Sequence, residues 1–354
     1  LYSWKTWIAG RVYPVVPPID FMLKIPPSLH LLLFGVSLGL LLLIIFVKPN
    51  RKILIVLFLL ELASCSLDTA RWQPWEFMYL CFFLTVILNF SKPKTILLLF
   101  HLLLVSTFFY SGLHKLNRSF LELVWRDTVL KMFFGLTDEM IIRFKLFFAG
   151  LLIPLFEMVF AVLLLFKKDK KQISYGLIAM HFVILMLLGP LGLNYNSIVW
   201  IWNAAIITVL FLLYRDGSFA VTKSFVIRHF PWMILWFVLP VFSFFGRYYQ
   251  YFSFSLYSGK GAYLYICAKK NVTDLLPFNE KSYVVFCNRE TGMNSQTFAM
   301  SELKSASVPE PEIQKKIGEI LLERYGSENI SVFLYDTETQ TMTQLAEKPV
   351  KSRK

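Results

Sequence analysis

Long apolar runs are the feature that most limits what this chain can fold into. Eight of them follow one another along the sequence, at about 29–47, 52–67, 75–90, 95–113, 145–166, 173–190, 196–213 and 230–246. A helix needs roughly 20 apolar residues to cross the hydrocarbon core of a bilayer. Backbone groups in that core must be hydrogen-bonded within the chain, which favours helices. The sequence therefore predicts a membrane all-α fold with at least eight transmembrane helices.

Composition supports the membrane class and argues against nucleic-acid binding. Hydrophobic residues make up 56% of the chain and charged residues 17%, whereas soluble domains contain about 45–50% and about 25%. The net charge is +13, but most basic residues lie between the apolar runs and in the tail, where they orient helices. Residues 1–28 are rich in proline, so we expect an interfacial segment there, with an earlier helix missing before Leu1.

The loops between the runs alternate in charge. Basic residues gather in four of them, at 48–52, 91–94, 167–171 and 215–229. The loops at about 68–74 and 189–195 carry little or no net charge. Because Lys and Arg accumulate on the cytoplasmic side of membrane proteins, we expect the basic loops in the cytoplasm. The far end of the fourth run and the whole C-terminal tail are then expected outside it.

The chain changes character after Gly246. We expect the membrane domain to occupy residues 29–252 and a small α+β extracytoplasmic domain with a basic tail to occupy 255–354. Aromatic and β-branched residues predict strands at 257–270 and 281–290, and a hairpin at 330–345. The proline-led amphipathic stretch at about 310–325 predicts a helix, and residues 348–354 form a loose basic end.

The four cysteines fall into two pairs of different kinds. Cys65 and Cys81 lie inside apolar runs and are expected to be small core residues. Cys267 and Cys287 lie in the polar tail. These two can form a disulfide if the tail lies outside the cytoplasm.

The segment at 110–120, YSGLHKLNRSF, combines an apolar helix end with several polar groups. Gly112 is expected to break the helix. Four polar or charged side chains follow it: His114, Lys115, Asn117 and Arg118. An amine and an imidazole at the edge of a bilayer can change charge with a small change of depth. The alternative is a snorkelling lysine beside an interfacial histidine, which is common at helix ends.

The loop at about 114–144 is too long for a tight turn. Residues 121–134 mix apolar and charged side chains at helical spacing, which predicts an amphipathic helix on the membrane surface, covering a cavity near Lys115. An ordinary packed re-entrant loop explains the same pattern equally well.

Ionisable residues inside apolar runs are costly and are candidates for function. The sequence has four of them: Glu61, His101, Glu157 and His181. Because neighbouring runs usually pack together, we expect Glu157 and His181 to meet and share a proton or an ion pair. The alternative is that they only fix the register of their helices. His101 is expected to lie nearer the cytoplasm, and no spacing suggests a metal site.

Several of these residues together resemble a known family. The motif SGLHKLN, the acid Glu157 inside the next apolar run and the histidine His181 in the middle of the run after it are similar to the vitamin-K-dependent γ-glutamyl carboxylase and its bacterial relatives. The wider group is the horizontally transferred transmembrane (HTTM) family. The stretch RWQPW at 71–75 also resembles the bacterial members.

This resemblance implies a carboxylase-like bundle in a bacterial cytoplasmic membrane, acting as a lyase and quinol epoxidase. Lys115 matches the base that deprotonates vitamin K hydroquinone, or menaquinone hydroquinone. Oxygen addition then yields an alkoxide that removes a proton from a substrate glutamate, which takes up carbon dioxide as the quinone leaves as an epoxide. His114, His181 and Glu157 would support the base. The quinone would lie against the remaining site residues: Arg71, Trp72, Trp75 and Asn117.

This chain departs from the family at one position, and the departure affects the expectation of carboxylation but not that of proton abstraction. Where the carboxylase has a functional histidine at the outer start of the third run, this chain has Gln73, Pro74 and Trp75. Quinol binding and proton abstraction are still expected, whereas carboxylation loses a residue that the family uses. The implied partners are membrane lipids, the quinone and an extracytoplasmic protein or peptide substrate, without nucleic acid and without a metal.

Two other functions fit parts of the sequence. A non-catalytic membrane module that binds a lipid or protein partner would display the outer α+β domain. A transporter would use Glu157 and His181 as a proton relay, although no inverted repeat is evident in the sequence.

Overall fold

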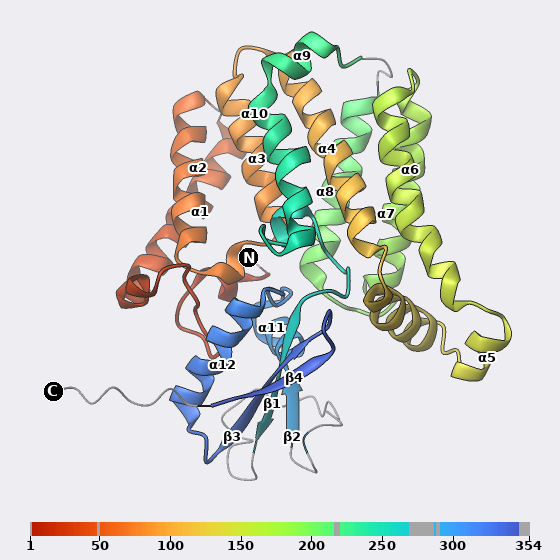
Figure 1. The fold of residues 1–354 in the computed structure, drawn as a ribbon. Coiled ribbons are helices and arrows are strands. Elements are labelled where there is room, and N and C mark those ends of the chain that lie inside the picture. Colours follow the sequence, from red (N-terminus) through yellow and green to blue (C-terminus); the bar gives the residue numbers. More distant parts are fainter. Residues whose placement is uncertain (1, 48–49, 216–219, 269–286, 288–290, 347–354) are drawn as a thin grey trace. The chain divides into compact units, whose positions relative to one another are not determined.

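The computed structural model describes residues 2–47, 50–215, 220–268, 287 and 291–346 (Figure 1). The chain divides into two compact units. The first comprises Leu1–Lys48, Leu59–Trp72 and Lys260–Lys354, and the second comprises Pro49–Phe58 and Gln73–Gly259. The division passes through the second apolar helix, and it groups the first apolar helix with the C-terminal domain.

The apolar runs form helices. Their bounds are α1 Pro27–Phe46, α2 Arg51–Ser66, α3 Pro74–Leu88, α4 Pro93–Lys115, α6 Leu152–Phe166 with the preceding turn η5 Phe147–Leu151, α7 Lys170–Leu188 and α8 Ser197–Tyr214. The last run is helical in three consecutive pieces: α10 Phe230–Met233, η6 Ile234–Val238 and η7 Leu239–Phe245. Proline occupies the first turn of several of these helices, where its missing N–H costs no hydrogen bond.

Five of the described helices are long and apolar enough to cross a membrane. They are Pro27–Phe46, Pro93–Lys115, Phe147–Phe166, Lys170–Leu188 and Ser197–Tyr214. The helices Pro74–Leu88 and Phe230–Phe245 are apolar but shorter. The chain is therefore an integral membrane protein by its helices, and the number of helices that meet the length criterion is smaller than the eight expected from the runs.

The second unit is organised around α4. Of its most apolar window, 61% is buried, against 22–33% for the windows of Phe147–Phe166, α7 and α8. Leu99, Leu103 and Leu104 are fully or almost fully buried in the core that α4 shares with α3, α6 and the last apolar segment. Because α4 is enclosed by protein along most of its length, most of its polar residues from His101 to Lys115 are buried against other parts of the protein.

Two shorter helices follow α4. The helix η4, Phe120–Phe133, has π geometry and occupies most of the predicted amphipathic stretch. The short helix α5, Asp138–Arg143, comes next. Trp125 of η4 donates a hydrogen bond from Nε1 to the carbonyl of Leu146 at 2.8 Å, and it packs against Gly150 of η5. These contacts confirm a helix here and attach it to the start of α6.

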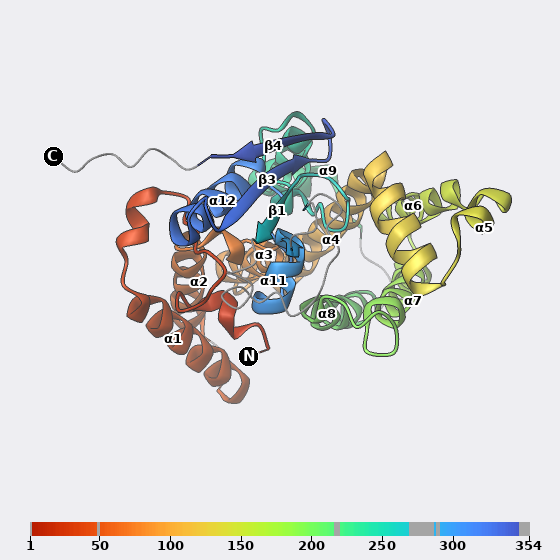
Figure 2. The ribbon, with the colours of Figure 1, turned by 90° about the horizontal axis from the view of Figure 1, so that it is seen from below.

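The C-terminal domain is a four-stranded antiparallel sheet with two helices. The strands are β1 Ala262–Ala268, β2 Thr291–Asn294, β3 Ile330–Asp336 and β4 Thr341–Leu345, in the order β2-β1-β3-β4. The helices are α11 Ser295–Leu303 and α12 Pro311–Tyr325, and both contact the sheet (Figures 1 and 2). The predicted helix at 310–325 and the hairpin at 330–345 are confirmed, whereas nearly all of 281–290 lies outside the described residues.

The N-terminal segment belongs to the same unit as this domain. Glu302 of α11 accepts hydrogen bonds from the backbone N–H groups of Val12 and Tyr13, at 2.8 and 2.6 Å. The Tyr13 hydroxyl pairs with Ser307 at 2.9 Å, and burial raises the pKa of Tyr13 to about 12. The proline-rich segment is thus held by the C-terminal domain.

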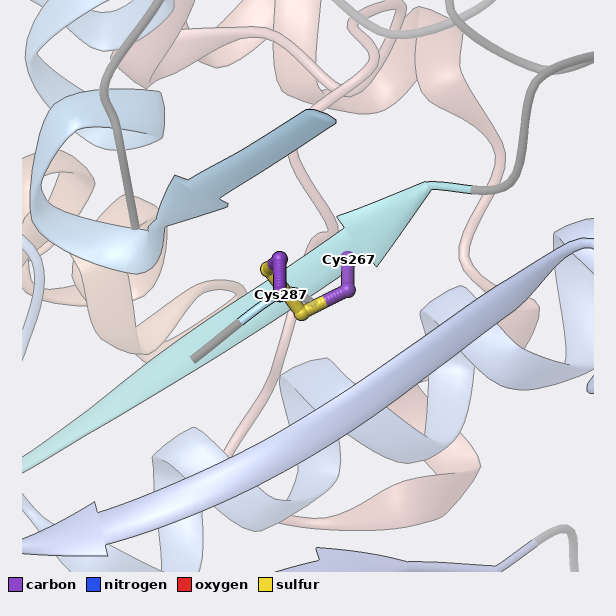
Figure 3. The surroundings of a disulfide bond; sticks show 2 residues. All are labelled: Cys267 and Cys287. Atoms are coloured by element: carbon purple, nitrogen blue, oxygen red, sulfur yellow. A yellow bond between two sulfur atoms is a disulfide. The ribbon is translucent and has the colours of Figure 1, made fainter. Parts of the chain in front are cut away.

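Cys267 at the end of β1 forms a disulfide with Cys287 (Figure 3). The predicted pairing is therefore present in the structure. The bond joins residues that are 20 positions apart in the sequence.

Removing this disulfide is expected to destabilise the first unit by about 3 kcal/mol, because it frees a loop of this length in the unfolded chain. The measurement is the thermal midpoint of Cys267→Ala/Cys287→Ala compared with wild type, each with and without a reductant. The reductant should lower the midpoint of the wild type and leave the double variant unchanged. Thiol labelling of both cysteines in unreduced, denatured wild type would contradict the pairing.

Candidate functional site

A buried ion pair joins the end of α4 to α6. The Nζ of Lys115 lies 2.8 Å from Oε2 and 3.0 Å from Oε1 of Glu157. The same ammonium also donates to the hydroxyl of Ser111 at 2.6 Å. The side chains of Lys115 and Glu157 are only 9% and 5% exposed. A charge pair so far from water is costly unless its hydrogen bonds are complete, and here all three donors of the ammonium have oxygen acceptors close by.

Gly112 permits this pair to form. The expected helix break is wrong, because α4 continues through Gly112 to Lys115. A Cβ atom at position 112 would lie 2.7 Å from the carbonyl oxygen of Pro154 and 3.1 Å from the Cβ of Glu157. Glycine is required because the backbones of α4 and α6 approach each other closely, which brings the two charged side chains together.

Replacing Gly112 with Ala is expected to lower the thermal midpoint, at a cost of about 1–3 kcal/mol, because the new methyl group must push α6 away from α4. The matched control is Gly35→Ala in α1, where a Cβ would meet nothing within 4 Å. That control should be neutral or slightly stabilising, since Ala is a better helix former than Gly. Equal midpoints for the two variants would contradict the close approach.

His181 lies in the same region but has a different partner from the one expected. Its Nδ1 is 2.5 Å from Oδ1 of Asn203 on α8, and its ring is 5.6 Å from that of Phe108 on α4. It is close enough to Lys115 and Glu157 to interact with both charges. The predicted direct pairing of Glu157 with His181 is corrected: the carboxylate of Glu157 is bound to the ammonium of Lys115 at the end of α4.

His114 and Asn117 have packing contacts of their own. Nε2 of His114 lies 3.1 Å from the hydroxyl of Ser243, and its ring stacks on Phe244 with centroids 4.3 Å apart. The side chain of Asn117 donates to the carbonyls of His114 and Ser258, and it accepts from the N–H of Phe120 at 2.9 Å. In this arrangement Asn117 connects α4 to η4, and His114 contacts the last apolar segment.

Arg71 belongs to the other compact unit. Its five N–H groups all have acceptors, which are the carbonyls of Thr6, Trp7 and Ser64, the hydroxyl of Ser64 and Nδ1 of His30. Only 1% of the residue is exposed. With every donor occupied, Arg71 stabilises the protein and has no N–H left for the quinone contact that the resemblance implied.

The two tryptophans of the RWQPW stretch fall on either side of the division between the units. Trp72 follows the short helix η3, Thr69–Arg71, and is the last residue of the Leu59–Trp72 segment of the first unit, whereas Trp75 is the second residue of α3 in the second unit. Trp75 is buried, with its ring 6.1 Å from that of Trp202 on α8. The structure thus brings Lys115, Glu157 and His181 together, while Arg71 and Trp72 lie in another unit.

The two remaining intramembrane candidates are separate from the ion pair. His101 precedes Lys115 by 14 positions on one helix, which is about 20 Å along its axis, and its Nδ1 pairs with the hydroxyl of Tyr214 at 2.8 Å. Glu61 is buried in the first unit. His101 is therefore distant from the Lys115 end of α4, as expected.

Sequence reasoning missed Asn203 and Ser111. Asn203 is a polar side chain inside an apolar run, so the search that found Glu157 and His181 would have found it had neutral amides been included. Ser111 precedes Lys115 by four residues, which places the two on one helix face.

The arrangement can hold one proton between an amine and a carboxylate, away from water, beside an imidazole. Within the described ranges there is no group of three His, Cys, Asp or Glu residues that could hold a metal ion. Comparisons of the chain with protein-family models, with curated proteins and with solved structures find no match.

Proposed function

We propose that this chain is a membrane enzyme in which Lys115, coupled to Glu157, is the base that removes a proton from a lipid-soluble quinol. The observation that carries the proposal is the buried ion pair at the end of α4. Ionisable side chains enclosed within a membrane bundle are costly and are rarely retained without a role. The resemblance of SGLHKLN to the carboxylase family supports the same residue as the base.

The pair offers a way to make a neutral amine. Lys115 must lose a proton before it can accept one, and Glu157 is in direct contact to receive it. Transfer from Nζ to the carboxylate converts two buried charges into two neutral groups, which a low dielectric favours. The amine then takes the hydroxyl proton of the quinol, and the resulting ammonium stabilises the quinolate anion beside it.

We also propose that the enzyme converts the quinol to its epoxide, and that it is a bacterial carboxylase-like lyase of the HTTM type. It stops short of peptide carboxylation, because Gln73, Pro74 and Trp75 stand where the family has its histidine. It also includes at least eight spans, with the C-terminal domain outside the cytoplasm. The basic loops support this orientation, and so does the disulfide, since such bonds persist in oxidising compartments.

The test is mass spectrometry of the lipids that co-purify with the protein in mild detergent. Wild type is compared with Lys115→Ala and with the matched control Lys94→Ala, an exposed lysine at the other end of the same helix. A quinone retained by the wild type and the control but lost from Lys115→Ala is the expected result. Phospholipid alone in all three samples would contradict the proposal and favour the non-catalytic module.

A further inference from the structure

The imidazole of His181 is held by one nitrogen only. Its Nδ1 pairs with Oδ1 of Asn203 at 2.5 Å. Its Nε2 is buried and has no hydrogen-bond partner among the residues that the structure describes. The exposed fractions of His181 and Asn203 are 6% and 2%. Buried polar atoms are almost always hydrogen-bonded in folded proteins, so we expect a ligand to pair with Nε2.

The hydrogen bonds of Asn203 determine which nitrogen of His181 carries the proton. The Nδ2 of Asn203 donates to the carbonyl of Val199, one turn earlier in α8, at 2.7 Å. That bond fixes the amide so that Oδ1 faces the ring, and a carbonyl oxygen can only accept. Nδ1 of His181 must therefore be protonated, and in the neutral ring Nε2 is left with its lone pair.

We propose that Nε2 of His181 accepts a hydrogen bond from a hydroxyl group of the substrate, and that Asn203 is the positioning residue that keeps this nitrogen unprotonated. An acceptor selects a donor, so the ligand is a hydroxyl compound rather than a carbonyl or an ether. The aromatic ring of Phe108 beside the imidazole suits a ligand with an apolar body. This inference rests on the proposed function, because the hydroxyl belongs to the quinol on which Lys115 acts. It is the hydroxyl that keeps its proton, while Lys115 takes the proton of the other.

The electrostatic interaction of His181 with both charges of the ion pair supports this position. His181 interacts with Lys115 and with Glu157, so a hydroxyl at Nε2 lies in the region of the proposed base. A phosphatidylcholine headgroup fits less well, because it has no N–H or O–H group to donate a hydrogen bond. A water molecule can donate, and the experiment separates it from the quinol.

The experiment is nitrogen-15 NMR of histidine-labelled full-length protein in phosphatidylcholine nanodiscs under anaerobic conditions. The His181 signals are identified by their loss in His181→Phe. Two probes are added in turn: reduced menaquinone-4, and its dimethyl ether, which has the same body without hydroxyl donors. We expect an Nδ1-protonated ring before addition and a shift of the Nε2 signal with the hydroquinone alone.

The variant Asn203→Leu separates positioning from packing. It should give a mixture of the two ring tautomers and bind the hydroquinone about tenfold more weakly, with unchanged binding of the dimethyl ether. The variant Asn203→Asp keeps an acceptor at this position and should restore the Nδ1-protonated ring. A circular-dichroism spectrum like that of wild type shows that each variant is folded.

Three results would overturn the inference. They are an Nε2-protonated ring in the wild type, equal shifts with both probes, and no shift with either, the last of which would assign the site to water. Each of these leaves the test of Lys115 by co-purified quinone intact, so the two proposals can fail separately.

Discussion

Replacing Glu157 with Gln is expected to lower the stability of the membrane domain by about 3–5 kcal/mol, because it leaves the ammonium of Lys115 buried without its counter-charge. Lys115→Met should have a similar effect, since it leaves the carboxylate of Glu157 buried without its counter-charge. The double variant Lys115→Met/Glu157→Gln has neither charge and should recover most of the loss. The measurement is the thermal midpoint in detergent for the four proteins of this double-mutant cycle.

The cycle also separates stability from chemistry. Loss of quinol turnover in a single variant can result from unfolding alone, whereas the double variant is expected to be folded and still inactive. Glu122→Gln is a suitable control, because the partner of Glu122, Arg118, has a side chain that is 77% exposed. Its effect should stay within about 1 kcal/mol. A double variant no more stable than either single variant would contradict direct coupling between Lys115 and Glu157.

Replacing Arg71 with Leu is expected to cost about 4 kcal/mol, because it leaves buried acceptors of its five hydrogen bonds without donors. Arg71→Lys should lose less, since an ammonium has three donors but cannot reproduce the planar fork. The measurement is the thermal midpoint together with proteolysis of the N-terminal segment, which Arg71 holds through the carbonyls of Thr6 and Trp7.

The matched control for Arg71 is Arg118→Leu, which removes an exposed guanidinium and should change the stability by no more than about 0.5 kcal/mol. An Arg71→Leu variant as stable as this control would show that the hydrogen bonds of Arg71 contribute little. Arg71 would then be available for the ligand role implied by the resemblance of the RWQPW stretch to the bacterial carboxylase relatives.

The parts of the fold that depend on local sequence could be predicted. An apolar run must form a helix in a bilayer whatever its neighbours are, so the helices were found with small errors at their ends. The helix α12 and the hairpin β3–β4 carry their own turn and cap signals. The pairing of Cys267 with Cys287 followed from only two cysteines being present in the tail.

The partners within the site depended on tertiary packing, which the sequence does not show directly. Gly112 has the same local signature as a helix breaker, and only the proximity of Pro154 shows that it serves packing. Glu157 was assigned to His181 because consecutive helices usually pack together. Its partner is instead Lys115 at the end of the preceding apolar helix, because α4 and α6 pack against each other.

In the RWQPW stretch, the sequence suggests a ligand site where the structure shows a residue with all its hydrogen bonds made within the protein. A buried arginine beside tryptophans resembles a ligand site in the sequence, and its saturation by backbone carbonyls appears only when the fold is known. Two of those carbonyls, from Thr6 and Trp7, belong to the N-terminal segment, more than sixty positions away from Arg71 in the sequence. Whether every N–H group of a guanidinium has an acceptor depends on the tertiary structure, and no spacing rule in the sequence detects it.

The most direct test of the central claim is turnover of reduced menaquinone-4 by the purified protein in nanodiscs, in the presence of oxygen. Three proteins are compared: wild type, the folded double variant Lys115→Met/Glu157→Gln and the control Lys94→Ala. Epoxide formed by the wild type and by Lys94→Ala, and absent with the double variant, is the predicted result. Equal epoxide formation by all three, or none by a wild type that holds the quinol, would contradict the assignment of Lys115 as the base.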